Sequence, residues 1–189
     1  MFRKMNSKTS LNSMRILLIC CFILFVAAVR ILPHPWNFTP IGAMAIFSGA
    51  KLNSKWAAFL MPLSALFLSD IFVGLYKLMI VVYLSFCLSV LIGRYVRTRQ
   101  TFLPISMATV LGAMQFFLVT NFAFWLFGFG AYPKSLAGLT MCYVAGIPLF
   151  VNTLAGDSFY AVILFGGFTL VERLSPAFRT NEAVGFMRT

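Results

Sequence analysis

Long apolar runs separated by short polar segments make up most of this 189-residue chain. A helix needs roughly 20 apolar residues to span a bilayer, and most of the runs approach that length. The second run is short, and the sixth contains two glycines and a proline. The pattern therefore predicts an all-α bundle of membrane helices. The seven runs cover residues 16–32, 38–50, 56–75, 78–92, 102–129, 136–154 and 159–171.

The basic residues lie at alternate ends of these runs, which predicts how the chain crosses the membrane. If the N-terminus is cytoplasmic and the first five runs each cross, then Lys51, Lys55 and the arginines of 94–99 fall inside. A sixth run that crossed fully would leave the C-terminal arginines outside. We therefore predict six spanning helices with a short second helix, a re-entrant or broken segment before the last helix, and both termini cytoplasmic. Twelve of the 15 lysines and arginines then lie inside.

Composition supports this class and excludes others. The chain is 61% hydrophobic and 10% charged, which is far outside the range of a soluble domain. Its net charge of +11 lies at the ends of the runs, so we expect contact with the lipid bilayer and no nucleic-acid partner. We predict a basic tail over 1–15, a membrane domain over 16–173 and a second tail over 174–189. The first run also resembles a signal peptide, but an uncleaved span fits a chain that is membranous throughout.

A polar turn follows the first run. Residues 33–40 read Pro-His-Pro-Trp-Asn-Phe-Thr-Pro, with three prolines and the only histidine of the chain. Proline at this density cannot continue a helix, because it lacks the amide donor and restricts the residue before it. We expect an ordered turn at the outer membrane face that forms the lid or wall of a ligand site.

Once the orientation is set, the polar residues of the membrane segments fall toward the outer half. A charge at membrane depth costs at least about 2.5 kcal/mol, so Asp70 needs a partner, and the candidates are Arg30, His34, Lys77 and Lys134. Amides, carboxylates and indoles beside interrupted backbone are typical of a small-molecule site. The expected substrate-binding residues are Arg30, His34, Trp36, Asn37, Asp70, Tyr83, Asn121, Trp125, Asn152 and Asp157.

Each of these residues also has a purely structural interpretation. Asp70 and Arg30 could only fix two helices together, and Asp157, between Gly156 and Ser158, could cap the start of the last helix. The asparagines could satisfy broken backbone, and the aromatic residues could be interfacial anchors. The convergence of polar groups on one side favours the binding site.

No motif in the chain indicates catalysis, a metal or a cofactor. His34 has no second histidine or cysteine at ligand spacing, and the four cysteines lie inside apolar runs. A Gly-x-x-x-x-Gly-Lys loop, a Gly-x-Ser-x-Gly elbow and a His-Glu-x-x-His motif are all missing from the sequence. We therefore expect a protein that is not an enzyme and that takes any energy for its work from elsewhere.

Several segments resemble an uncharacterised family of small bacterial membrane proteins described as transport proteins. They are the run from Leu32 to Ala43, Ser69-Asp70, 82–86, Thr120-Asn121-Phe122, Tyr132-Pro133-Lys134 and 152–157. More distantly, the order of the elements is similar to the substrate-capture S components of energy-coupling-factor (ECF) vitamin transporters.

The resemblance implies a function and partners. It implies a subunit in the bacterial inner membrane that captures a small solute, such as a vitamin-like micronutrient, near the outer face. It also implies a transmembrane coupling subunit with two ATPases. S components usually dock that subunit through a small-x-x-x-small pattern on helix one, and here Ala45-x-x-x-Gly49 on helix two is the nearest substitute. The alternative function is a structural or accessory membrane protein without a ligand.

Overall fold

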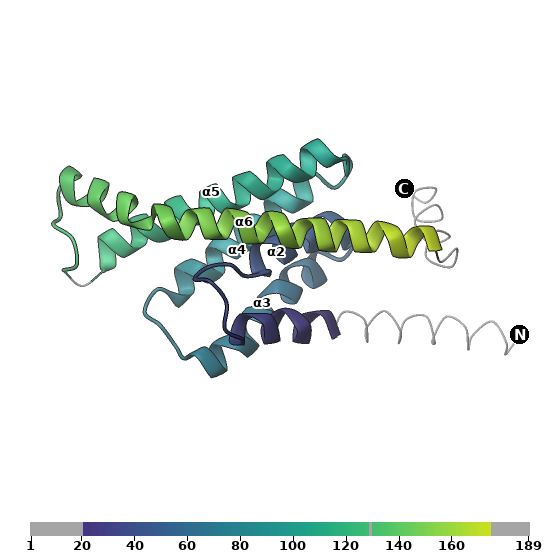
Figure 1. Cartoon of the computed structure of the whole chain (residues 1–189), viewed down its shortest axis with the longest axis horizontal. Helices are drawn as coiled ribbons and strands as arrows, with labels where there is room; N and C mark the ends of the chain where they lie inside the picture. Colours follow the sequence, from purple (N-terminus) through teal and green to yellow (C-terminus); the bar gives the residue numbers. More distant parts are fainter. Residues whose placement is uncertain (1–20, 129, 175–189) are drawn as a thin grey trace, which may run out of the picture.

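The computed structural model describes residues 21–128 and 130–174, which form six helices and no strand (Figure 1). The predicted tail 1–15 and all of the tail 174–189 except its first residue lie outside this range. The all-α class is confirmed. The helices are Cys21–Ile31, α2 (Ile41–Lys51), α3 (Lys55–Val73), α4 (Met79–Tyr95), α5 (Phe102–Phe127) and α6 (Leu136–Leu174).

Three of these helices, α3, α5 and α6, are long and apolar enough to cross a membrane. The helices Cys21–Ile31, α2 and α4 are also apolar but shorter in the described part of the chain. Successive helices run in opposite directions along the bundle, so that connections 32–40 and 74–78 and the residues 130–135 before α6 lie toward the same side, on the left in Figure 1. The chain is therefore a multi-pass membrane protein, and the number of crossings stays a prediction.

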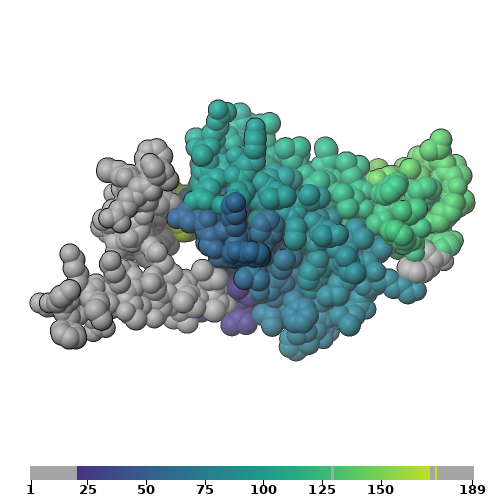
Figure 2. Space-filling model, turned by 180° about the vertical axis from the view of Figure 1, so that it is seen from behind, coloured from purple at the N-terminus to yellow at the C-terminus, as the bar shows by residue number. Residues whose placement is uncertain are grey.

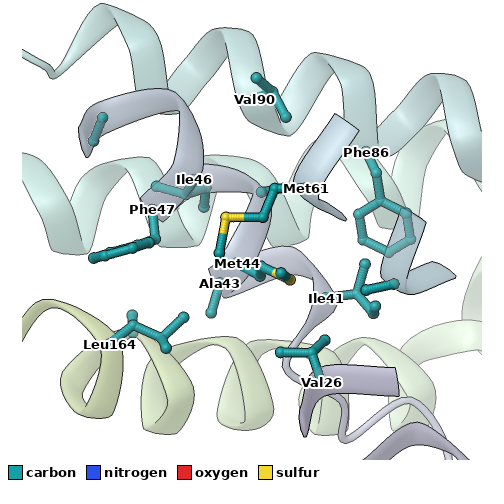
Figure 3. Packing of buried hydrophobic residues seen from close by; sticks show 14 of the residues in the cluster. Val26, Ile41, Ala43, Met44, Ile46, Phe47, Met61, Phe86, Val90 and Leu164 are labelled. Carbon is teal, nitrogen blue, oxygen red and sulfur yellow. The ribbon is translucent and has the colours of Figure 1, made fainter. Parts of the chain in front are cut away.

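Helix α2 lies at the centre of the bundle. It has 11 residues, as the short second helix predicted, and its residues 41–50 are all buried. It packs against α3, α4, α5 and α6. Figure 3 shows its apolar side chains, such as Met44 and Phe47, in one cluster with Met61 of α3, Val90 of α4 and Leu164 of α6. A helix that is apolar on all sides is expected where protein surrounds it.

Glycines bring α2 and α4 into backbone contact. A β-carbon at Gly49 would collide with the carbonyl oxygen of Val90, and one at Gly93 would collide with the carbonyl oxygen of Ile46. The expectation that Ala45 and Gly49 dock a partner subunit is therefore wrong. Both residues are buried inside this bundle, where their small size serves the contact with α4.

Polar side chains satisfy the backbone around α2. The Gln100 side chain donates to the carbonyl of Ala50 at 3.0 Å, and Arg97 donates to the carbonyl of Leu52 at 3.5 Å, both near the C-terminus of α2. Pro62 of α3 has no amide proton for the carbonyl of Ala58, and the Ser48 hydroxyl of α2 donates to that carbonyl instead, at 2.8 Å. These contacts fix the position of a short helix that is surrounded by apolar side chains.

The predicted break before the last helix is absent. The sixth and seventh apolar runs form the single helix α6 of 39 residues, with Pro148 inside it. At 1.5 Å per residue α6 is about 58 Å long. Glycine in this segment marks close packing instead of a break, because a β-carbon at Gly146 would meet the Asn121 side chain of α5. In Figure 2 the hairpin of α5 and α6, drawn in green, projects beyond the rest of the bundle.

Candidate ligand-binding site

Arg30 and Asp70 form an ion pair that connects the first helix to α3, as the need of Asp70 for a partner predicted. Nη1 of Arg30 also donates to the Ser69 hydroxyl at 2.5 Å and to the carbonyl of Leu66 at 3.4 Å. The Tyr83 hydroxyl of α4 donates to the second carboxylate oxygen of Asp70 at 3.0 Å. Asp70 is fully buried, so both oxygens of its carboxylate have the partners that burial requires.

Asp157 caps a different helix from the one expected. It lies well inside α6, and its Oδ1 accepts a hydrogen bond of 3.0 Å from the amide of Ala43 in the first turn of α2. Helix α2 has neither a side-chain cap of its own nor an acidic residue in its first turn. The carboxylate thus satisfies a free amide and meets the positive end of the helix dipole. Gly42 makes this possible, because a β-carbon there would occupy the position of the carboxylate.

The Pro33–Pro40 turn is ordered and enters the bundle beside α6. Its Phe38 packs against Phe159 and Tyr160, with ring centroids 6.0 and 5.7 Å apart. Asn37 has a positive φ of 64°, a conformation that asparagine tolerates better than most residues. The anchored Phe38 and this backbone conformation place Asn37 at the wall of two adjoining cavities.

The first cavity, which we call the polar cavity, has a volume of about 190 Å³. It lies between the first helix, the turn, and helices α2 to α6, and it is bordered by both signs of charge. Arg30 contributes a guanidinium, and Asp157, which is 3% exposed, contributes a carboxylate. Its lining residues are Arg30, Asn37, Thr39, Ile41, Gly42, Leu66, Tyr76, Val82, Phe86, Ser89, Gly112, Phe116, Thr153 and Asp157.

The second cavity, which we call the aromatic cavity, has a volume of about 260 Å³ and lies between α5 and α6. It shares Asn37, Phe116 and Thr153 with the polar cavity, so the two cavities are neighbours with these residues in both walls. Together they reach the size of ordinary small-molecule sites, about 300–1,000 Å³. Its other lining residues are Leu78, Phe117, Thr120, Asn121, Phe124, Tyr132, Cys142, Ala145, Gly146, Leu149 and Phe150.

The structure brings together four of the ten expected binding residues. Arg30, Asn37, Asn121 and Asp157 line the cavities. Asp70 and Tyr83 lie behind Arg30 and hold it.

The remaining four expected residues do not line either cavity. His34 contacts the carbonyl of Leu32, and Trp36 is 80% exposed. Asn152 donates to the carbonyl of Trp36, and Trp125 donates to that of Pro133. These contacts fit loop and interfacial roles. The described residues contain no group of side chains that could hold a metal ion.

Sequence reasoning missed most of the lining, and three of the missed residues bear on the chemistry of the site. Phe116 and Thr153 lie at the junction of the cavities, and nothing in the sequence sets Phe116 apart from the other 21 phenylalanines. Tyr76 lines the polar cavity beside Arg30, and its buried hydroxyl donates to no acceptor among the described residues. Burial, and then the nearby Asp70 carboxylate, raise the pKa of Tyr76 to about 12, so the hydroxyl keeps its proton.

The long apolar helices identify the chain as a polytopic helical membrane protein, and the polar cavity lies between its helices. Residues 10–178 match DUF6580, a family of unknown function, and the chain belongs to that family. No curated protein and no solved structure matches the chain.

Proposed function

We propose that the protein is a membrane-embedded substrate-binding subunit of a transporter, similar to an S component, that captures a small solute from the outer face. The observation that carries this proposal is the pair of adjoining cavities that the Pro-rich turn borders. Asn37 of that turn borders both spaces, together with Phe116 of α5 and Thr153 of α6. A turn that closes over a site is a natural gate for a ligand.

Charge supports an outward orientation of the cavities. They lie toward the side of the bundle that holds connections 32–40 and 74–78 and the residues 130–135 before α6. Most basic residues of the described chain lie at the opposite end, which the positive-inside rule places in the cytoplasm of a bacterial inner-membrane protein. These residues are Lys51, Lys55, Arg94, Arg97, Arg99 and Arg173.

A transmembrane coupling subunit with ATPases belongs to this proposal as the source of energy. Its docking surface differs from the Ala45–Gly49 pair, because that pair is covered by α4. The competing function, an accessory protein without a ligand, accounts well for the Arg30–Asp70 pair and for the capping role of Asp157. It does not account for the polar cavity, which Arg30 and Asp157 both line.

Two alanines of α6 provide a matched test. Ala145 lines the aromatic cavity and Ala155 lines neither cavity, while both are exposed in the same helix. We expect native mass spectrometry of gently extracted protein to find a bound small molecule in the wild type and in Ala155→Trp, and to find none in Ala145→Trp. Equal occupancy in all three proteins, or none in any, would favour the accessory protein.

A further inference from the structure

Two charged residues border the polar cavity, and only one of them has an ionic partner. Arg30 is neutralised by Asp70, with which it forms an ion pair. Asp157 also borders the cavity, and among residues 21–128 and 130–174 it pairs with no cation. The cavity therefore borders a buried carboxyl group without a cationic partner, in a setting where an unpaired charge is costly.

The backbone of α2 satisfies one oxygen of the Asp157 carboxyl group. The carboxylate accepts from the Ala43 amide and lies at the positive end of the α2 dipole. That contact uses Oδ1, and the carboxylate is 3% exposed at the cavity wall. A helix end supplies only about half a unit of positive charge, so a carboxylate here has room for a cation in the cavity as a second partner.

The rest of the lining fits the same kind of ligand. Phe86 and Phe116 pack together with centroids 5.0 Å apart, and both border the polar cavity. Aromatic rings in a wall favour a positive nitrogen as the ligand group. Phe116 also lines the aromatic cavity, together with Phe117 and Phe150. Tyr76 keeps a buried hydroxyl free for a neutral acceptor on the ligand.

The geometry points to a small organic cation as the ligand: an aromatic amine whose protonated nitrogen pairs with Asp157 and whose ring occupies the aromatic cavity. This inference rests on the proposed function and specifies the class of solute. An anionic or a neutral solute of the same shape would leave Asp157 unpaired.

Equilibrium binding to the purified full chain in detergent tests this class. The probes are benzylamine, phenethylamine and tryptamine, each beside its neutral N-acetyl form, with phenylpropanoate as the acid. We expect at least one amine to bind, and its N-acetyl form and the acid to bind about tenfold more weakly or worse, a difference of about 1.4 kcal/mol. Comparable binding of an amine and its N-acetyl form, tighter binding of the acid, or no amine binding would overturn the inference.

Asp157→Asn separates the charge from the cap. Asparagine can still accept from the Ala43 amide, so the end of α2 stays capped while the negative charge is lost. We expect amine binding to fall to the level of the N-acetyl form. Thr169→Val, on an exposed position of α6, is the control and should bind like the wild type. Undiminished amine binding by Asp157→Asn would contradict the inference.

Failure of the inference and failure of the proposed function give different results. If the wild type carries a neutral or anionic solute that Ala145→Trp excludes, the protein is a binding subunit for another class of ligand. If no occupancy responds to Ala145→Trp, the binding function itself is wrong.

Discussion

Single polar residues fix how the helices of this bundle meet. Asp70 joins the first helix, α3 and α4 through Arg30 and Tyr83, and Ser48 of α2 supplies the hydrogen bond that Pro62 of α3 cannot make. Each contact compensates a group that would be costly if left unpaired in an apolar surrounding. The positions of such residues therefore report which helices are neighbours.

The Arg30–Asp70 pair leads to a double-mutant prediction. Asp70→Leu leaves the Arg30 guanidinium without its buried partner, and we expect the free energy of unfolding to fall by about 3–5 kcal/mol. Replacing both residues, as Arg30→Met with Asp70→Leu, removes the unpaired charge and should restore most of that loss. Thermal unfolding in detergent measures all three variants, and a double variant no more stable than Asp70→Leu would contradict the interpretation.

Residue chemistry also explains what could be predicted from the sequence. The partner of Asp70 was predictable because a buried carboxylate requires a cation and few cations lie on that side of the bundle. The partner of Asp157 was not, because a glycine before it and a serine after it look like a local helix start. The amide that it caps lies 114 residues away in the chain.

At the scale of elements, α2 owes its burial to its small residues. Gly49 and Gly93 let α2 and α4 approach until the backbones touch, and this contact is why a helix of 11 residues is held without reaching across a membrane. The same residues looked like a docking motif in the sequence. Nothing in one chain distinguishes a small-residue contact within a protein from a contact between proteins.

Overpacking of this contact should be destabilising. We expect Gly93→Ala to lower the free energy of unfolding by about 1–3 kcal/mol, because its methyl group would collide with the carbonyl of Ile46. Gly167→Ala in α6 is the matched control, since nothing lies within 4 Å of a β-carbon there. That variant should be neutral or more stable, by up to about 1 kcal/mol, from helix propensity. Equal stability of the two variants would mean that α2 and α4 can move apart at little cost, and it would contradict a tight contact at Gly93.

The limits of sequence reasoning at this scale are clearest in α6. Gly138, Gly146 and Pro148 are the usual signs of a broken helix, and they predicted the wrong element. In the structure Gly146 makes room for Asn121, and Pro148 occupies a place inside the helix. Proline leaves one carbonyl unpaired, and membrane helices tolerate that loss where other groups satisfy the backbone.

At the scale of the whole molecule, the continuous α6 replaces the predicted broken segment and last helix. It still ends on the side of the bundle where the C-terminus was predicted to lie. A broken segment that returned to the outer face, followed by a last helix, would carry the chain inward once. The single helix α6 does the same, because it starts at the end where α5 stops and runs to the opposite end (Figure 1). The alternating helices and the distribution of basic residues are compatible with the orientation proposed above.

Cysteine labelling tests that orientation. In a variant without the native cysteines, Ala131→Cys lies in the connection between α5 and α6, and Thr98→Cys lies in the connection between α4 and α5. Both positions are exposed. In whole cells we expect a membrane-impermeant maleimide to label Ala131→Cys fully and Thr98→Cys only after permeabilisation. The reverse pattern would turn the cavities toward the cytoplasm, and capture of a solute from outside would then be impossible, because the Pro-rich turn would open on the wrong side.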